Sequence, residues 1–284
     1  MPAPSTAEAL SRRSPRVFRL FRWYARHYLA RGFHAIRISR TGPIPELPNR
    51  PVVVVLNHAS WWDPLVAIAL TNEFPEHRLH YAPIEAIGLA QYPFFERLGF
   101  FGIETSTRAG AARFLRTGLA LLEQPEVMLW VTGQGAFVDP RDRPIRLRPG
   151  IGHLAHRLSD SLIWTLAIEY PFWNDRCPEA LLRFGRPIAI EDGSIIRPRE
   201  WTSAIECSLE ETQDALAAEA RRRDPSAFSV LIGGTAGVGG VYDYWRRMRA
   251  WLDGQTFRSE HAIQAAESTE DRQLHGIDGR NTNE

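Results

Sequence analysis

Apolar and arginine residues alternate with a helical period near the start of the chain. Between residues 14 and 34 the apolar positions recur every three or four residues, and arginines fill much of the opposite side. The apolar positions are Val17, Phe18, Leu20, Phe21, Tyr24, Ala25, Tyr28 and Leu29. This pattern predicts an amphipathic basic helix.

The arm that carries this helix is strongly basic, although the formal net charge of the chain is only +1. Nine arginines and no carboxylate lie between Glu8 and Glu46. A helix with Trp23 and Tyr28 beside arginines is typical of a segment that lies on anionic lipid head groups. We predict that residues 1–40 form a membrane-surface helix. The alternative is a helix docked on the protein core with its arginine face in water.

The next apolar run, residues 52–56, is apolar at consecutive positions, which predicts a strand buried on both faces. Similar short strands are predicted at residues 79–82, 100–104, 127–131, 162–168 and 181–184, and helices at 109–123, 151–158 and 200–223. Strands that alternate with helices predict an α/β fold with a largely parallel central sheet flanked by helices. A second basic aromatic helix, residues 242–252, would place basic amphipathic helices near both ends of the chain.

The C-terminal part of the chain changes in character. Residues 226–258 are predicted to form a glycine-rich hinge followed by the second basic aromatic helix, and residues 259–284 a polar, disordered tail. The glycines of residues 233–240 do not have the spacing of a Rossmann or P-loop motif, so they do not predict nucleotide binding.

Composition excludes several classes of protein. The chain contains no lysine, which removes a P-loop lysine and a Schiff-base lysine. Its two cysteines, Cys177 and Cys207, have no CxxC partner, so neither a disulfide framework nor a zinc site is indicated. No apolar run approaches the roughly 18 to 20 residues of a membrane-spanning helix, and no signal-peptide core is present. We expect a cytoplasmic protein, peripheral on the inner face of a membrane.

One polar segment directly follows residues 52–56 and reads Asn57-His58-Ala59-Ser60-Trp61-Trp62-Asp63-Pro64. Polar residues at the carboxyl end of a parallel strand lie where open α/β sheets bind their ligands. His58 and Asp63 are five residues apart and cannot share one face of a regular helix, so the segment must turn. Asp63 followed by Pro64 predicts a helix N-terminus and leaves His58 in the preceding loop.

Such a turn would bring the Asp63 carboxylate onto one imidazole nitrogen of His58. That contact fixes the tautomer and leaves the other nitrogen able to take a proton, as in a catalytic dyad. The alternative is that Asp63 only caps a helix and that His58 is a loop histidine. Spacing alone leaves both interpretations open.

The pattern Asn57-His58-x-Ser60-x-x-Asp63 resembles the His-x4-Asp block of the phospholipid/glycerol acyltransferase superfamily, the family of lysophosphatidic acid acyltransferases. In that family the histidine deprotonates the acceptor hydroxyl, which attacks the thioester of acyl-CoA or acyl-carrier protein, and the aspartate supports it. The resemblance therefore implies that His58 is the general base and Asp63 its orienting carboxylate. It also implies an acyltransferase domain over residues 41–225.

Two further blocks resemble the family only in part. The second block reads Gly99-Phe100-Phe101-Gly102-Ile103-Glu104, and Thr105 stands where the family has a phosphate-binding arginine, so Arg108 is the nearest substitute. The third block, Phe-Pro-Glu-Gly-Thr-Arg in the family, is here Thr132-Gly133-Gln134-Gly135-Ala136-Phe137. Gly135 matches, which implies a backbone N–H for the thioester oxyanion. Gln134, which replaces the family's glutamate, is assigned together with Gly135 to oxyanion and donor binding.

Acceptor binding is assigned to polar and basic residues around these blocks. Residues 139–150 contain four arginines, whose guanidinium groups are suited to phosphate. The residues assigned to the acceptor are Asn57, Ser60, Arg108, Arg141, Arg143 and Arg146. The alternative for residues 139–150 is a solvated basic loop.

Together these features predict an O-acyltransferase that moves a fatty acyl group from acyl-CoA or acyl-carrier protein to a hydroxyl of a lysophospholipid or related lipid. No metal and no bound cofactor are expected. The expected partners are an anionic membrane surface, the thioester donor and the lipid acceptor, with no nucleic acid. Two alternatives stay open: a non-catalytic lipid-binding relative, and a thioesterase or lipid hydrolase. A serine hydrolase is not indicated, since no Gly-x-Ser-x-Gly elbow occurs.

Overall fold

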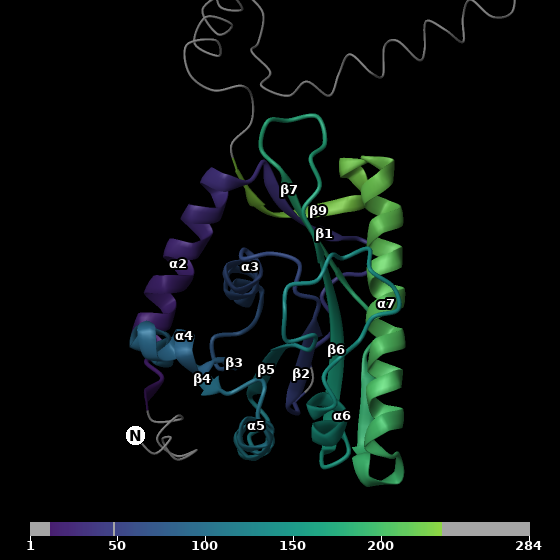
Figure 1. Cartoon of the computed structure of the whole chain (residues 1–284). Helices are drawn as coiled ribbons and strands as arrows, with labels where there is room; N and C mark the ends of the chain where they lie inside the picture. Colours follow the sequence, from purple (N-terminus) through teal and green to yellow (C-terminus); the bar gives the residue numbers. More distant parts are fainter. Residues whose placement is uncertain (1–11, 48, 235–284) are drawn as a thin grey trace, which may run out of the picture.

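The computed structural model describes residues 12–47 and 49–234, coloured in Figure 1. The strands are β1 (Ala35–Ser39), β2 (Val52–Leu56), β3 (Leu79–Glu85), β4 (Phe100–Ile103), β5 (Val127–Thr132), β6 (Ser159–Glu169), β7 (Glu179–Phe184), β8 (Ile188–Asp192) and β9 (Phe228–Gly233). The α-helices are α2 (Pro15–Gly32), α3 (Asp63–Leu70), α4 (Ala86–Gln91), α5 (Arg108–Leu122), α6 (Gly150–Ala155) and α7 (Pro198–Arg222). The 3₁₀ turns are η1 (Thr71–Glu73), η2 (Pro93–Leu98), η3 (Gly193–Ile195) and η4 (Pro225–Ala227).

The strands of these described residues form one sheet in the order β4-β3-β5-β2-β6-β7-β1-β9, with β8 also paired to β6. Neighbours from β4 to β6 run parallel, as do β7 and β1. The pairs β6–β7, β6–β8 and β1–β9 are antiparallel. The predicted α/β fold with a largely parallel central sheet flanked by helices is therefore confirmed.

Strand β2 is apolar at every position because helices cover both faces of the sheet. Val52, Val54 and Leu56 lie in one buried cluster with residues of α2 and α3. Val53 and Val55 lie in a second cluster with residues of α5, α6 and α7. Figure 1 shows α2 and α3 on one side of the sheet and α7 on the other. All five residues are therefore buried, and the polar block that follows β2 begins at an internal strand.

Helix α2 agrees with the predicted helical range and also docks on the core. It begins after Ser14, whose hydroxyl accepts a hydrogen bond from the Val17 N–H. Its own residues Phe18, Ala25 and Leu29 are buried against the rest of the protein, which supports the docked-helix alternative. Its outer face nevertheless exposes large apolar and aromatic side chains: Leu20, Trp23, Tyr24 and Tyr28.

The predicted domain boundaries at residues 40 and 225 are wrong, because each cuts through the sheet. Residues 35–39 form β1, which lies between β7 and β9, and residues 228–233 form the edge strand β9. The arginine of β1, Arg37, is buried because its Nε donates to a Glu179 carboxylate oxygen at 3.0 Å. The predicted helix at residues 242–252 and the tail at 259–284 lie outside the described residues.

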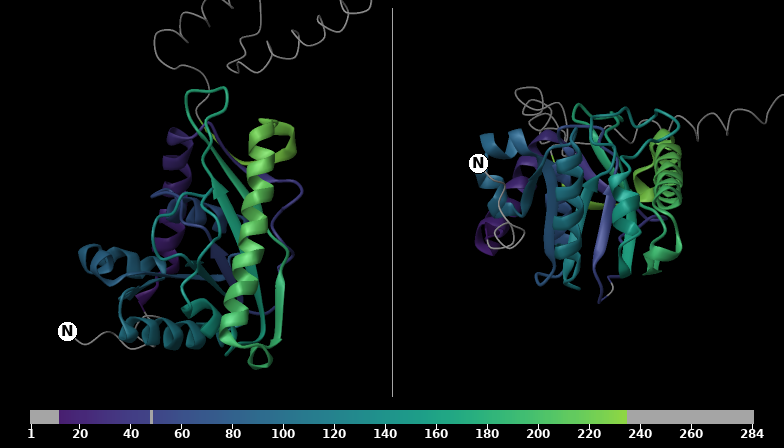
Figure 2. Two further views of the ribbon diagram at one scale, coloured as in Figure 1. Left: turned by 45° about the vertical axis from the view of Figure 1, so that its right-hand side comes forward. Right: turned by 60° about the horizontal axis from the view of Figure 1, so that its bottom comes forward.

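Residues 86–98 form a projection that the pattern of the sequence does not predict. Helix α4 and turn η2 follow β3 and stand away from the sheet, as the left view of Figure 2 shows. Among residues 12–47 and 49–234, no helix combines the length and the apolar character needed to cross a membrane.

Candidate active site

The turn between β2 and α3 brings His58 and Asp63 together. His58 Nδ1 lies 2.8 Å from Asp63 Oδ2, so the predicted contact is present. The carboxylate can only accept, so Nδ1 carries the proton and the neutral ring has its lone pair on Nε2. The Asp63 side chain is fully buried, whereas 18% of the His58 side chain is exposed. The carboxylate is thus withheld from water while the imidazole is partly accessible.

The Asp63 carboxylate accepts two more hydrogen bonds. The Ser60 N–H donates to the same oxygen, Oδ2, at 2.9 Å, and the Tyr170 hydroxyl donates to Oδ1 at 2.6 Å. Burial, and then the charge of Asp63, raises the pKa of Tyr170 well above its ordinary value, so the phenol keeps the proton it donates. Three donors therefore satisfy and orient this buried carboxylate.

The interpretation of Asp63 as only a helix cap is wrong. Helix α3 begins at Asp63 itself, and no side chain caps its N-terminus. The carboxylate instead contacts His58, Ser60 and Tyr170. Sequence reasoning missed Tyr170, which follows the last residue of β6 and is 107 positions from Asp63. Only the parallel pairing of β2 with β6 brings these two residues together.

The loop after β5 encloses the backbone of His58. The Gln134 side-chain oxygen accepts from the His58 N–H at 3.1 Å, and the His58 carbonyl accepts from the Val138 N–H at 2.9 Å. The Phe137 ring lies 4.2 Å from the imidazole, measured between ring centroids. His58 Nε2 has no hydrogen-bond partner among the described residues. These contacts fix the imidazole and leave its second nitrogen open.

The same loop changes the assignment of the oxyanion donor. The Gly135 N–H already donates to the Thr132 carbonyl at 3.1 Å, so it closes a turn and is not free for a ligand. Gln134 accepts from His58 through Oε1, which fixes its amide orientation and leaves the NH₂ group without a partner in the described part of the chain. Of the two residues assigned to the oxyanion, Gly135 therefore has its N–H engaged in this structure, whereas Gln134 offers N–H groups beside His58.

Arg148 links the second and third blocks in space. Its Nη1 donates to the Thr105 carbonyl at 2.8 Å, at the position where the family has an arginine. Its guanidinium arm also packs on Gly135, whose φ is +68° and where any side chain would collide with it. Arg148 is exposed and forms no ion pair with the described residues. It was not among the residues assigned to the acceptor, although it belongs to the same four-arginine segment.

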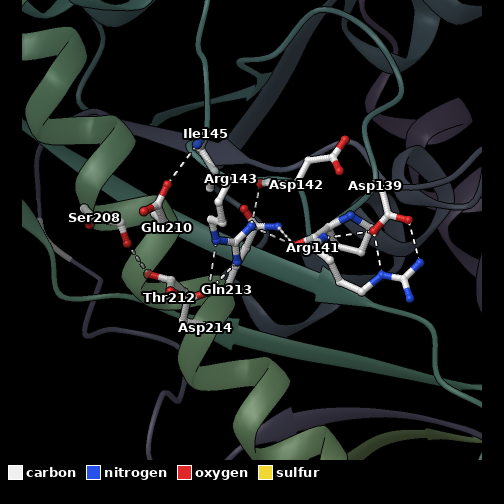
Figure 3. A network of polar contacts seen from close by, with 11 residues as sticks. Asp139, Arg141, Asp142, Arg143, Ile145, Ser208, Glu210, Thr212, Gln213 and Asp214 are labelled. Carbon is white, nitrogen blue, oxygen red and sulfur yellow. Dashed lines mark hydrogen bonds and ion pairs between the residues drawn. The ribbon is translucent and has the colours of Figure 1, made fainter.

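Two of the arginines that were assigned to the acceptor are paired with carboxylates instead. Arg141 makes a two-pronged contact with Asp139, with distances of 2.8 and 2.6 Å. This contact, led by the side-chain hydrogen bond, holds the pKa of Asp139 well below its ordinary value. Arg143 Nε donates to Asp214 of α7 at 3.0 Å. Figure 3 shows both pairs.

The main chain around Arg146 is bound to α7. The Ile145 and Leu147 N–H groups donate to Glu210 and Glu206 at 2.8 Å each, and Figure 3 shows the first of these bonds. Arg146 lies between these two buried residues and is exposed. This loop is therefore bound to α7 through its main chain and Arg143. The assignment of Arg141 and Arg143 to the acceptor stays a prediction, which their ion pairs do not favour.

Three other residues assigned to the acceptor lie in three different environments. Asn57 is buried, and its amide exchanges two hydrogen bonds with the backbone of Ile168, at 3.0 and 2.8 Å. It therefore joins β2 to β6 and cannot contact an acceptor, which corrects its assignment. Ser60 shapes the turn, since its hydroxyl accepts from the Trp62 N–H at 3.2 Å. Arg108 is exposed at the first position of α5.

A buried carboxylate, an oriented histidine and a flanking amide lie together at the carboxyl ends of β2 and β5, an arrangement suited to general-base chemistry. The family model described as Acyltransferase matches residues 35–169, from the first residue of β1 to the last of β6. The match confirms, over this part of the chain, the predicted resemblance to the phospholipid/glycerol acyltransferase superfamily.

Among solved structures, the chain is similar to the 1-acyl-sn-glycerophosphate (LPA) acyltransferase PlsC from Thermotoga maritima. The sequence identity is 12%, the TM-score is 0.47, and the superposition covers 71% of this chain and 80% of that chain. Among curated proteins, no sequence matches this chain significantly.

Proposed function

We propose that this protein transfers a fatty acyl group from a thioester, acyl-CoA or acyl-carrier protein, to a hydroxyl of a lysophospholipid or a related lipid. The observation that carries this proposal is the 2.8 Å contact between His58 Nδ1 and Asp63 Oδ2. It orients a partly exposed imidazole, and among residues 12–47 and 49–234 no side-chain nucleophile is hydrogen-bonded to its second nitrogen. A general base without its own nucleophile suits activation of a second substrate.

In the proposed reaction, His58 Nε2 takes the proton of the acceptor hydroxyl as the hydroxyl oxygen attacks the thioester carbonyl carbon. A C–O bond forms and the carbonyl oxygen becomes an oxyanion. The Gln134 NH₂ group donates a hydrogen bond to this oxyanion. The C–S bond then breaks, the oxyanion returns to a carbonyl, and the imidazolium gives its proton to the leaving thiolate. The products are an ester and a thiol, and no metal or cofactor takes part.

Asp63 stabilises the imidazolium that this reaction forms. Because Ser60 and Tyr170 hold both of its oxygens, the carboxylate needs no reorganisation when the positive charge develops. Tyr170 acts through Asp63 and is therefore a positioning residue. Arg148 is the arginine of residues 139–150 that lies beside the third block, so we assign it to a phosphate group of the acceptor.

We further propose that the protein works at the cytoplasmic inner face of a membrane, as a peripheral protein. The support is α2, whose outer face carries exposed aromatic side chains and arginines. Lipid acceptors and fatty thioesters gather at such a surface.

The test is thioester-dependent acylation of a panel of hydroxylated lipids, with lysophosphatidic acid, lysophosphatidylcholine and glycolipids as acceptors. We expect His58→Ala to lower kcat about 10²- to 10⁴-fold, the usual contribution of a general base. The matched control is His153→Ala, which changes an exposed histidine of α6 and should keep full activity. Tyr170→Phe should give an intermediate loss in kcat with little change in KM.

The two alternatives predict other products. Release of free fatty acid without any acylated lipid would identify a thioesterase or lipid hydrolase. Lipid binding that is unchanged in His58→Ala, with no product from either donor, would favour the non-catalytic lipid-binding relative and contradict the proposal.

A further inference from the structure

A series of aromatic rings connects the α4–η2 projection to the active-site turn. The rings of Phe94, Phe21, Tyr24, Tyr28, Trp62 and Trp61 follow one another with centroid distances of 5.6, 5.7, 5.7, 5.7 and 6.1 Å. We call these six residues the aromatic ridge. The ridge starts in η2, runs along α2 and ends in the turn that carries His58.

The projection at one end of the ridge exposes large apolar side chains to solvent. Ile87 is 78% exposed and Tyr92 is 54% exposed, and no charged residue occurs between Glu85 and Glu96. At the other end, Trp61 is 68% exposed, three residues from His58. A continuous apolar surface of this kind marks an interaction site, since it is costly to leave in water.

The charge around the ridge indicates what covers it. The exposed arginines of α2 are Arg16, Arg19, Arg26 and Arg31. None of the four forms an ion pair with the residues that the structure describes, and α2 contains no acidic residue. Unpaired arginines beside exposed tryptophan and tyrosine complement anionic lipid head groups above an apolar layer.

We propose that the aromatic ridge and the α4–η2 projection lie together on an anionic bilayer, with Ile87 and Tyr92 inserted below the head groups. The bilayer then contacts the protein at two separated elements, α2 and residues 86–98, and these fix the orientation of the molecule. In that orientation Trp61 brings the active-site turn to the lipid surface. A lipid acceptor can reach His58 along the ridge without leaving the membrane; this last step rests on the proposed function.

The test measures binding of the full chain to vesicles of phosphatidylglycerol and phosphatidylcholine by flotation. Burial of one large apolar side chain changes a partition coefficient by about 10-fold or more. We therefore expect the double variant Ile87→Ser with Tyr92→Ser to bind about 100-fold more weakly. Ile195→Ser is the matched control, because Ile195 is also 78% exposed but lies in η3; it should bind like the wild type.

Two outcomes would overturn the proposal. The first is that the double variant binds vesicles as tightly as the wild type does. The second is that the wild type forms a dimer in vesicle-free solution and the double variant does not. The projection would then be an interface between two copies of the chain.

The readout separates this inference from the proposed function. Vesicle binding needs no catalysis, so His58→Ala should bind vesicles like the wild type. If acyl transfer fails for every acceptor while the binding results are as expected, the proposed function is wrong. The proposed contact with the bilayer is then still supported. If the enzyme is active, the double variant should lose activity on vesicle-embedded acceptor and keep it on a water-soluble, short-chain acceptor; equal loss on both would contradict the role of the ridge.

Discussion

Two arginine-rich segments of this protein have similar composition and opposite environments. On α2, Arg16, Arg19, Arg26 and Arg31 are exposed and without ion pairs among the described residues. In the loop after β5, Arg141 is paired with Asp139 and Arg143 with Asp214. The first segment therefore presents positive charge to a partner, whereas much of the charge in the second is neutralised by carboxylates of the protein itself.

The difference comes from what packs beside each segment. Helix α2 contacts the core through apolar residues and has no carboxylate of its own. The loop runs along α7, which supplies Glu206, Glu210 and Asp214 as acceptors for its backbone and side chains. An arginine is available to a ligand only where the tertiary structure leaves it unpaired. Arg148, beside Gly135, is the member of the loop that meets this condition at the active site.

The largest expected effect comes from removing the unpaired charge of α2. Each arginine near an anionic membrane contributes about 1 kcal/mol, so changing Arg16, Arg19, Arg26 and Arg31 to Gln should weaken binding to anionic vesicles about 10³-fold. Flotation at several salt concentrations measures it. The control is Arg141→Gln with Arg143→Gln, which removes paired charges and should leave binding unchanged. If both variants lose vesicle binding to a similar extent, ion pairing of the arginines does not explain the difference between the two segments.

The next effect concerns Arg148. A hydrogen bond to a charged group contributes about 1.5 to 3 kcal/mol, so Arg148→Ala should raise the KM for a phosphate-bearing acceptor about 10- to 100-fold. The KM for a neutral hydroxylated lipid should change little, because that acceptor offers no anion. Arg146→Ala, in the same loop, is the control. If both variants affect both acceptors alike, Arg148 has only a structural role.

The inward side of α2 gives a third test, on stability. His80 is buried, and burial together with nearby Arg13, Arg22 and Arg78 lowers its pKa to about 3. The unfolded chain, with a histidine pKa of about 6.5, binds this proton more readily than the folded chain. The free energy of unfolding should therefore fall as the pH drops below 6.5, by about 1.4 kcal/mol per pH unit for this group.

Denaturant unfolding between pH 6.5 and 5 measures the slope of the free energy of unfolding against pH. His80→Gln keeps an acceptor for the Trp130 N–H, which donates to His80 at 3.2 Å, and should flatten the slope. His34 does not offset it: hydrogen bonding to Glu179 raises the pKa of His34, so its stabilisation is complete below pH 6.5 and is lost only as the pH rises. An unchanged slope in His80→Gln would assign the acid sensitivity to other groups.

The smallest effect is expected for the paired arginine Arg143. Its ion pair with Asp214 is partly exposed, at 27% and 63% for the two side chains, and such pairs contribute at most about 1 kcal/mol. Arg143→Gln should therefore lower the Tm by about 2 to 4 °C and leave the acceptor KM unchanged. Thermal unfolding and steady-state kinetics test the two parts. A large change in KM with an unchanged Tm would return Arg143 to the acceptor site.

Much of the central fold was predictable because its elements carry local patterns. Residues 52–56 and 127–131 are apolar at consecutive positions, and both are buried strands. Strands β1, β8 and β9 were not predicted. Strand β1 contains an arginine whose burial depends on Glu179, a residue 142 positions away. Periodicity within a segment cannot report a partner that distant.

The chain by itself determined the buried strand β2, the polar block that follows it and thus the resemblance to an acyltransferase family, because these depend on neighbours in sequence. The tertiary structure alone decided the rest of the site. It placed Tyr170 on Asp63, Gln134 on the His58 backbone and Arg148 on Thr105, across 107, 76 and 43 positions. Parallel strands align their carboxyl ends whatever the length of chain between them, so these contacts have no local signature.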